Sequence, residues 1–506
     1  MRESLFRRAV GAVARRRDQS FEQENPDSES GSDPVFNPGS NAGFGLMRSG
    51  MVTALLLTLL IGGATLIYRE RGRGDLTRLQ QHIQPALPQA TASAPQPGGQ
   101  DAVVLTRSQM FGGPAPQFLS VTLLPGRGMN TLQITAFLPG KGEIPLLVSP
   151  SIEAAAQRMI GTGADRNGLA SLEMGAAPLV PWADRLTGTL SADRGAMTTS
   201  WHGEGLSVPA SPAASVAGRE GQPEARGGLL LERAADTSDS RVMPDGGAAT
   251  AIFHAGNFAG HWPSTTDVTM ETLLSGRQLE LTITAKNTGT QAEPLGIGWS
   301  PRFLLPSGDR SQARLRVGAG KRLEVAASND QPGRASSLPT GRLLDVNGTA
   351  YDLQARGGAL LGPGDFDVTF ADLKTKLLDS GPVVELNDPA SGYGLRITAL
   401  SSKIKAIHVS SPAGSNYVSI SPQFNYDDPL GREWAADEDT GMQVLEPGRT
   451  VEWRVRLEMF AMENDTNGTG SSGSGTQLGP GLPRRGTLEP AGESSNPDRG
   501  GELAGR

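Results

Sequence analysis

Cysteine is absent from this chain of 506 residues, which excludes disulfide bonds, cysteine nucleophiles and thiolate metal sites. Histidine is scarce, with five residues, and no histidine or glutamate spacing typical of a metal site occurs. No glycine-rich phosphate loop stands between a strand and a helix, so we expect neither a metal nor a cofactor. A sustained basic face is also missing and the net charge is −7, which argues against a nucleic-acid partner.

Long apolar runs are missing too, with one exception at residues 50–68. These 19 residues carry no charge and are rich in leucine and isoleucine. As a helix they would span roughly 28 Å, which matches a bilayer core of about 30 Å. Flanking charges argue against a buried core helix, and the lack of a small-residue cleavage site directly after the run argues against a signal peptide. We therefore predict a transmembrane helix over residues 49–68, with residues 50–68 in the lipid bilayer.

The distribution of arginine predicts the orientation of this helix. Residues 1–48 hold seven arginines, whereas residues 69–78 hold four. The near flank alone favours the opposite orientation, because only Arg48 lies directly before the span. Long domains, however, translocate regardless of charge. We predict a cytoplasmic N-terminus and a periplasmic or extracellular C-terminal domain.

Composition divides the rest of the chain. Residues 1–48 form an arginine-rich tail that has too few apolar side chains to fold, so we predict disorder there. Residues 69–115 are predicted to be a polar Pro/Ala linker, and residues 463–506 a disordered tail rich in Gly, Ser and Pro. Residues 116–462 hold short alternating strands with turn residues between them and no long helical period. This pattern predicts an all-β domain, a large antiparallel β-sandwich that follows the single transmembrane helix in the chain.

One strand, at residues 279–286, alternates apolar and polar side chains most clearly. Period two is typical of a strand with one buried face. A turn signal follows at residues 287–289, and the chain then returns through residues 294–299, which are apolar and rich in glycine. Glycine within a strand indicates that the backbone passes close to another part of the molecule.

The motif that ends this second strand resembles the galactose mutarotase (aldose 1-epimerase) family. In that family a strand of the same character follows an Asn-x-Gly turn and enters His-Pro-Tyr-Phe-Asn-Leu, whose histidine is the catalytic acid. Residues 300–305 of this chain are Ser-Pro-Arg-Phe-Leu-Leu. The resemblance implies a galactose mutarotase-like supersandwich fold, and it places Ser300 at the position of the catalytic histidine.

Further landmarks occur in the family's order. Residues 181–186, Pro-Trp-Ala-Asp-Arg-Leu, are similar to the family's Pro-Trp/Tyr-Ala-Asn-Arg-Ile. This implies that Arg185 contacts sugar hydroxyls, and Asp184 stands where asparagine is usual. A histidine–glycine pair that helps to hold the sugar ring comes next in the family, and the nearest match here puts Gly227 at the histidine position.

Two landmarks follow in the C-terminal half. Residues 367–370 are similar to an Asp-x-x-Phe motif, which implies that Asp367 hydrogen-bonds the sugar. Residues 418–425 match a stretch that ends in Glu-Pro-Gln, whose glutamate is the catalytic base. Here Ser421 occupies the glutamate position and Gln423 is kept. The resemblance thus implies substrate binding through Arg185, Asp367 and Gln423, with no retained catalytic residue.

Mutarotation opens a hemiacetal ring by removing a proton from the anomeric hydroxyl while a second group protonates the ring oxygen. Each transfer requires a group that titrates near working pH and contributes on the order of 10²–10⁴ in rate. Serine does not titrate there, so Ser300 and Ser421 predict that most of the activity is lost. Asp427 and Asp428 follow shortly after Gln423, and His254, His261 and His408 lie elsewhere in the domain, but none of them stands at a catalytic position of the family. We expect His261 to be structural and His408 to be a packed or surface histidine of its strand.

Three hypotheses follow. The first is a membrane-anchored aldose 1-epimerase-like domain that binds a hexose or related sugar and has weak or no mutarotase activity. The second is an active aldose 1-epimerase or sugar isomerase with a relocated acid and base, which predicts a histidine or carboxylate pair beside Arg185. The third is a cell-envelope scaffold that binds no sugar.

Overall fold

The computed structural model describes residues 94–107, 115–211, 223–326 and 338–462. The two predicted disordered tails, the predicted transmembrane helix at residues 49–68 and most of the predicted linker lie outside these ranges. Within them, no helix combines the length and the apolar character needed to cross a membrane. All of the described residues belong to one compact unit.

In these ranges, eleven strands form the first large sheet. They are β1 (Val103–Thr106), β2 (Gln117–Leu124), β3 (Asn130–Leu138), β4 (Gly142–Pro145), β5 (Ala176–Leu179), β16 (Gly298–Leu304), β18 (Ala319–Val325), β19 (Pro339–Asp345), β21 (Phe366–Leu373), β24 (Ala406–Ser411) and β25 (Tyr417–Gln423). Their order across the sheet is β1-β2-β3-β5-β16-β25-β24-β21-β18-β19, and β4 pairs with β3. The strands pair antiparallel. β16 lies between β5 and β25, although both of these strands are far from it in the sequence.

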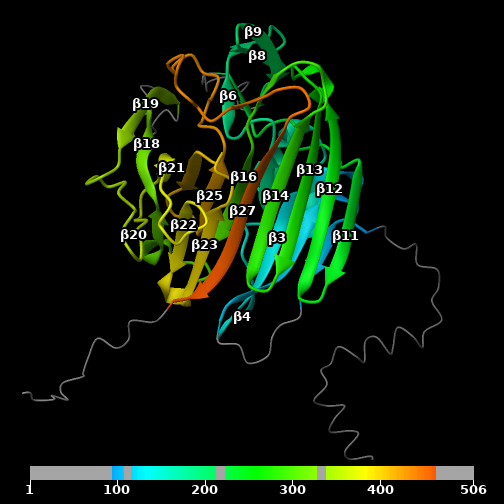
Figure 1. Ribbon diagram of the computed structural model, residues 1–506. Helices are drawn as coiled ribbons and strands as arrows, with labels where there is room; N and C mark the ends of the chain where they lie inside the picture. Colours follow the sequence, from blue (N-terminus) through cyan, green and yellow to red (C-terminus); the bar gives the residue numbers. More distant parts are fainter. Residues whose placement is uncertain (1–93, 108–114, 212–222, 327–337, 463–506) are drawn as a thin grey trace, which may run out of the picture. The chain divides into compact units, whose positions relative to one another are not determined.

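A second sheet of nine described strands packs against the first. They are β11 (Thr237–Met243), β12 (Gly246–Gly256), β13 (Thr266–Ser275), β14 (Gln278–Asn287), β17 (Arg314–Val317), β20 (Ala359–Leu360), β22 (Val383–Asp388), β23 (Tyr393–Ala399) and β27 (Thr450–Ala461). Their order is β11-β12-β13-β14-β27-β23-β22-β17-β20. In Figure 1, β27 lies in the middle of this sheet, between β14 and β23.

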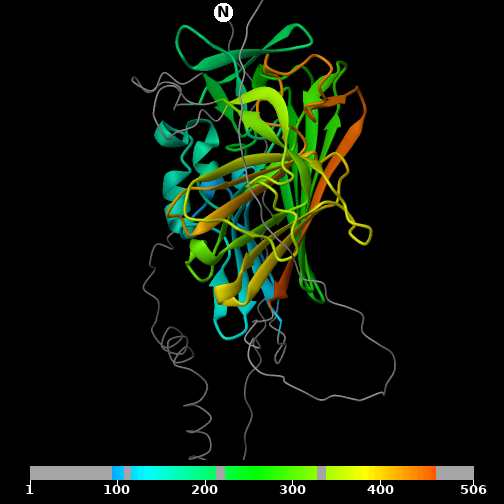
Figure 2. The ribbon, with the colours of Figure 1, turned by 90° about the vertical axis from the view of Figure 1, so that its left-hand side faces the viewer.

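Smaller elements complete the domain. They are the strands β6 (Arg185–Thr187), β7 (Thr189–Leu190), β8 (Ala196–Trp201), β9 (Glu204–Pro209), β10 (Glu224–Arg226), β15 (Glu293–Leu295) and β26 (Gln443–Leu445), the helix α3 (Ile152–Arg158), and the short 3-10 segments 97–99, 125–127, 163–172, 258–260, 310–312 and 389–391. Figure 2 shows the helical segments as cyan coils at one side of the sheets. The pair β6 and β10 forms a sheet of its own, which carries Arg185.

The two large sheets bury one continuous hydrophobic core. On β14 the even positions from 280 to 286 face outward, while Leu279 and Ile283 are buried, as the alternating sequence predicts. Large side chains enter the same core from both sheets, among them Trp299 of β16 and Trp453 of β27, each fully buried. The predicted all-β, antiparallel sandwich is therefore confirmed for the described residues.

The glycine-rich strand passes close to its neighbours, as the sequence suggested. A Cβ atom at Gly296 would overlap the side-chain oxygen of Asn425, and one at Gly298 would lie 2.7 Å from the Cβ of Ala183. Asn425 in turn bonds the backbone of Ala183 on both sides, through Oδ1 at 3.1 Å and Nδ2 at 3.0 Å. The two glycines thus let β16 lie directly against the loop that leads into Arg185.

The start of the folded domain differs from the predicted boundary. Residues 69–115 were expected to form a linker, but β1 pairs with β2 in this region. Leu105 is buried in the core, and the side chain of Arg107 forms an ion pair with Asp245 at 2.6 Å. A strand of four residues between proline- and glutamine-rich segments is too short to stand out by periodicity, which explains the difference.

Candidate functional site

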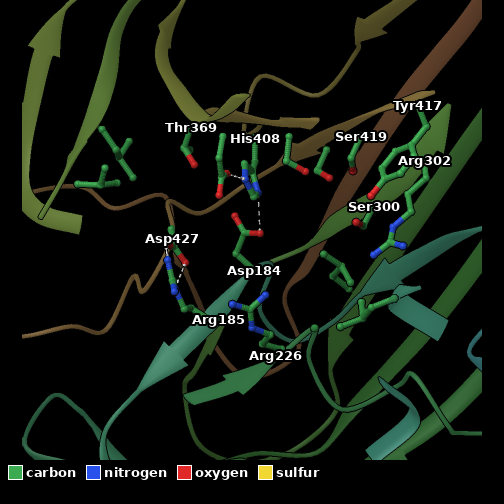
Figure 3. Close-up of a pocket in the computed structure, with 18 residues that line it drawn as sticks. Asp184, Arg185, Arg226, Ser300, Arg302, Thr369, His408, Tyr417, Ser419 and Asp427 are labelled. Carbon is green, nitrogen blue, oxygen red and sulfur yellow. Dashed lines mark hydrogen bonds and ion pairs between the residues drawn. The ribbon is translucent and has the colours of Figure 1, made fainter. Parts of the chain in front are cut away.

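A cavity of about 240 Å³ opens on the face of the first sheet, over β16, β25, β24 and β21 and beside the loop before β6 (Figure 3). Its volume leaves room for a ligand of the size of one sugar ring. Polar side chains dominate its wall: Asp184, Arg185, Arg226, Ser300, Arg302, Asp367, His408, Tyr417, Ser419, Ser421 and Asp427. Arg185, Asp367, Ser300, Ser421 and Gly227 all line it, so the residues singled out by the sequence pattern meet in one place.

Strand register explains how these residues converge. On a strand, alternate side chains point to the same face, and partners on neighbouring strands lie side by side. One row across the sheet consists of Thr369, His408 and Ser421, and the next of Asp367, Ser410, Ser419 and Arg302. The two rows form the floor of the cavity.

Ser300 and Ser421 lie level with each other on adjacent strands. Gly298 pairs with Gln423 and Arg302 pairs with Ser419, which puts Ser300 opposite Ser421 between them. Both side chains line the cavity, as the family resemblance implied for the acid and base positions. Hydroxyl groups therefore occupy the part of the wall where titrating groups were expected.

Gly227, which the resemblance places where the family has a histidine that helps to hold the sugar ring, brings no side chain to the cavity. Its φ of +78° is in the left-handed region that favours glycine, and a Cβ atom there would lie 2.8 Å from Leu231 and 3.0 Å from Leu172. No larger residue fits at this position without a shift of those leucines.

His408 points into the cavity between two carboxylates. Its Nδ1 lies 2.9 Å from Oδ1 of Asp184, and its Nε2 lies 2.7 Å from Oδ1 of Asp367. Figure 3 shows the imidazole directly above Asp184. The expectation that His408 is a packed or surface strand histidine is wrong, because β24 turns this side chain toward the cavity rather than into the core or onto the outer surface.

The two carboxylates determine the charge of the imidazole. Burial opposes protonation of His408, but the charge of Asp184 and the hydrogen bonds to both carboxylates outweigh it and raise the pKa of His408 well above its usual value. Burial also opposes ionisation of Asp184, yet the charge of His408 and hydrogen bonds from His408 and Gln423 lower the pKa of Asp184 to about 2. Near neutral pH the group is an imidazolium ion held by two carboxylates.

The backbone conformation of Asp184 and a hydrogen bond from Gln423 hold the Asp184 carboxylate next to His408. The backbone of Asp184 has a φ of +58°, a conformation that Asp and Asn adopt more readily than most residues. Nε2 of Gln423 donates to Oδ2 of Asp184 at 2.8 Å, and the residue itself is fully buried. Gln423 therefore positions Asp184 and does not line the cavity itself.

Arg185 is paired with Asp427 at another part of the wall. Its Nε lies 2.9 Å from Oδ1 of Asp427 and its Nη2 bonds the other oxygen, while Glu224 lies 3.6 Å away. Burial raises the pKa of Asp427 to about 6, and the charge of Arg185 opposes that rise. The pairing holds the guanidinium group rigidly beside the cavity. Asp428, the next residue, bonds Thr187 instead.

The remaining candidates lie elsewhere. His254 pairs with Asp267 on the second sheet at 3.0 Å, and His261 lies 2.7 Å from the backbone oxygen of Ser207. Neither histidine lines this cavity. Among the described residues, no group of three or more histidine, aspartate or glutamate side chains is arranged to hold a metal ion.

Sequence reasoning missed the role of His408 and the partner of Asp184. One feature of the sequence could have indicated this pairing: Asp184 replaces the asparagine that is usual in the galactose mutarotase family, and it adds a carboxylate there. A histidine brought next to this carboxylate is a natural counter-ion for it. The periodicity of β24 did not reveal which face of that strand the histidine occupies.

Comparisons with known proteins agree with this architecture. Residues 239–458 match the family model for aldose 1-epimerase. No curated protein matches the chain in sequence. The chain is similar in structure to a galactose mutarotase-like protein from Clostridium acetobutylicum, with 15% identity, a TM-score of 0.53, and coverage of 71% of this chain and 98% of that one. It is also similar to the GalM/aldose epimerase homologue from C. elegans, with 15% identity, a TM-score of 0.51, and coverage of 72% and 99%. Residues 239–458 thus carry the aldose 1-epimerase pattern, and the domain has the galactose mutarotase-like fold.

Proposed function

We propose that this protein is a carbohydrate-binding, aldose 1-epimerase-like protein with weak or no mutarotase activity. The observation that carries the proposal is the combination of a polar cavity of sugar size with hydroxyl groups at Ser300 and Ser421. Arg185 and Asp367 line this cavity and supply a donor and an acceptor for sugar hydroxyls. Gln423 contributes indirectly by positioning Asp184.

His408 does not replace the missing base in this proposal. Both of its ring nitrogens already face carboxylates, and the raised pKa keeps it protonated near neutral pH. An imidazolium ion cannot accept a proton from an anomeric hydroxyl. The group instead presents fixed charge and hydrogen-bonding capacity to a ligand.

A mutarotation assay tests the proposal. Freshly dissolved α-glucose or α-galactose is followed by polarimetry or NMR with the full chain, and we expect the spontaneous rate within about twofold. Sugar titration by calorimetry should give heats that weaken with Asp367→Asn. A matched control is Asp267→Asn, which removes the carboxylate of an Asp–His pair outside the cavity. Flat heats with a broad panel of sugars would instead favour the scaffold hypothesis.

A specific observation favours a second candidate, an active epimerase with relocated groups. The imidazolium of His408 and the carboxylate of Asp427 line the same cavity beside Arg185. In this alternative His408 protonates the ring oxygen while Asp427 removes the proton of the anomeric hydroxyl, and both transfers reverse after rotation. Strong acceleration that His408→Gln and Asp427→Asn both abolish would establish it and refute the first proposal.

We further propose that residues 50–68 anchor the protein in a membrane, with the N-terminus in the cytoplasm. The uncharged run of 19 residues supports this proposal. Because the chain has no cysteine, a single substitution gives labelling without background. Leu377→Cys lies at a fully exposed loop position. A membrane-impermeant maleimide should label it in intact cells, and labelling only after lysis would contradict this orientation.

A further inference from the structure

Arg302 is a cation of the cavity wall with no carboxylate partner among the described residues. It lies on β16, and its guanidinium carbon is 5.6 Å from the centre of the Tyr417 ring. Nη1 donates to the backbone oxygen of Glu173 at 3.0 Å, which is a neutral acceptor. The carboxylate of Glu173 is paired with Arg158 at 2.7 Å instead.

The other cations of the cavity are already matched. Arg185 is paired with Asp427, and Nε of Arg226 lies 2.6 Å from Oε1 of Glu224. His408 is held between two carboxylates. The cavity is therefore polarised, with its carboxylates gathered around His408 and Arg185, and with Arg302 at a distance from them. Figure 3 shows this separation, with Arg302 and Tyr417 on one side and Asp427 on the other.

The surroundings of Arg302 suit an anion. Ser419 is its direct partner across the strands, and Ser300 lies two residues before it on the same face of β16. With Tyr417, these residues bring three hydroxyl groups to the part of the wall that holds the guanidinium group (Figure 3). Hydroxyls donate to anionic oxygens, and arginine binds carboxylate or phosphate through two parallel hydrogen bonds.

We propose that the ligand of this cavity is a sugar with an anionic substituent and that Arg302 binds this substituent. The carboxylate of a uronic acid and the ester of a sugar phosphate share the required chemistry. In this arrangement the neutral hydroxyls of the ring face Asp184, Asp367 and Arg185, and the anionic group faces Arg302. This inference rests on the proposed sugar-binding function and narrows its ligand class.

The test compares neutral and anionic sugars of one series by calorimetry on the full chain, in a detergent without a sugar headgroup. The probes are glucose, glucuronate and glucose 6-phosphate, with galactose and galacturonate as a second series. We expect at least one anionic sugar to bind about tenfold or more tightly than its neutral parent, which is the effect of one charge-assisted hydrogen-bonded contact. Which anion is preferred distinguishes a carboxylate from a phosphate ligand.

Two variants assign the preference to Arg302. Arg302→Gln should bring the anionic sugar to the affinity of the neutral one, whereas Arg302→Lys, which keeps the charge, should retain part of the preference. Arg241→Gln removes an exposed arginine of β11 on the second sheet and should change nothing. In the unmodified protein, the preference should also weaken as the salt concentration rises.

The outcomes separate this inference from the proposed function. Binding of glucose or galactose with no anionic preference overturns the inference and leaves the sugar-binding proposal standing. A preference that survives Arg302→Gln also overturns it. If no sugar binds, both proposals are wrong.

Discussion

Glu293 is a buried carboxyl group that no cation of the described residues neutralises. Its Oε2 accepts a hydrogen bond from Thr266 at 2.8 Å, while its buried Oε1 has no hydrogen-bond partner in the part of the chain that the structure describes. Burial raises its pKa to about 7, and the hydrogen bond from Thr266 opposes that rise only in part. The folded state thus binds a proton more tightly than the unfolded chain, whose group titrates near 4.5.

We expect Glu293→Gln to remove a pH dependence of stability. The protonated glutamic acid contributes its full share below pH 4.5, and this share is lost as the pH rises through about 7. At pH 8 the charged form costs about 3 kcal/mol, which the neutral glutamine avoids. Thermal unfolding at pH 5 and pH 8 measures this. A variant whose Tm at pH 8 is not higher than that of the parent would show that Glu293 is not the titrating group.

His408 gives a second prediction at this scale. Because its pKa is raised in the folded protein, its contribution to stability is present below pH 6.5 and is lost as the pH rises through the higher folded value. In NMR titrations we expect its ring signals to remain those of imidazolium at pH 7.5. In Asp184→Asn, which removes the largest favourable charge, the same signals should move toward the neutral form. A neutral ring at pH 7.5 in the parent protein would contradict the assigned charge.

At the scale of elements, the contact between β16 and the loop before β6 depends on glycine. A methyl group at Gly296 would displace Asn425, whose side chain bonds the backbone of Ala183 and Tyr426. Loss of these buried hydrogen bonds together with the overlap costs on the order of 2–4 kcal/mol.

Gly296→Ala should therefore lower the free energy of unfolding by about this amount, as measured by urea denaturation. It should also weaken sugar binding, because the displaced loop carries Asp184 and leads into Arg185. Gly364→Ala is the control, since a Cβ atom there meets no atom within 4 Å. Equal stability of the two variants would show that the loop adapts without cost.

The strands and the loop before β6 differ in how well the sequence predicts them. The period-two pattern of residues 279–286 predicted the strand that the structure confirms as β14. The family resemblance singled out Ser300, Ser421 and Arg185, which line one cavity. Both depend on local pattern or on residue order. The pairing of Asp184 with His408 depends instead on where the loop before β6 lies against β24 of the first sheet, and the two residues are 224 positions apart in the sequence. Period two alone cannot reveal such a partner.

At the scale of the whole molecule, the last described strand lies in the middle of the second sheet. Strand β27 pairs with β14 along nine residues and with β23 along seven, and it buries Trp453. A central strand supplies hydrogen bonds to both neighbours, so neither half of this sheet is complete without it.

We expect a chain that ends at residue 449 not to fold. Without β27 both β14 and β23 become open edges, and the core loses a fully buried tryptophan, whose removal alone costs about 3–5 kcal/mol. Circular dichroism and limited proteolysis measure the outcome. Trp453→Phe keeps the strand and most of the buried surface, and it should fold with reduced stability. A protease-resistant, cooperatively unfolding truncated chain would contradict the prediction.

The position of β27 also has a consequence during synthesis. About 160 residues separate the end of β14 from the start of β27. At about 5–20 residues per second, a ribosome needs on the order of ten to thirty seconds to make them. Throughout that interval the nascent polypeptide lacks the central strand that joins the two halves of its second sheet. The sandwich is therefore assembled only after nearly the whole domain has been translated.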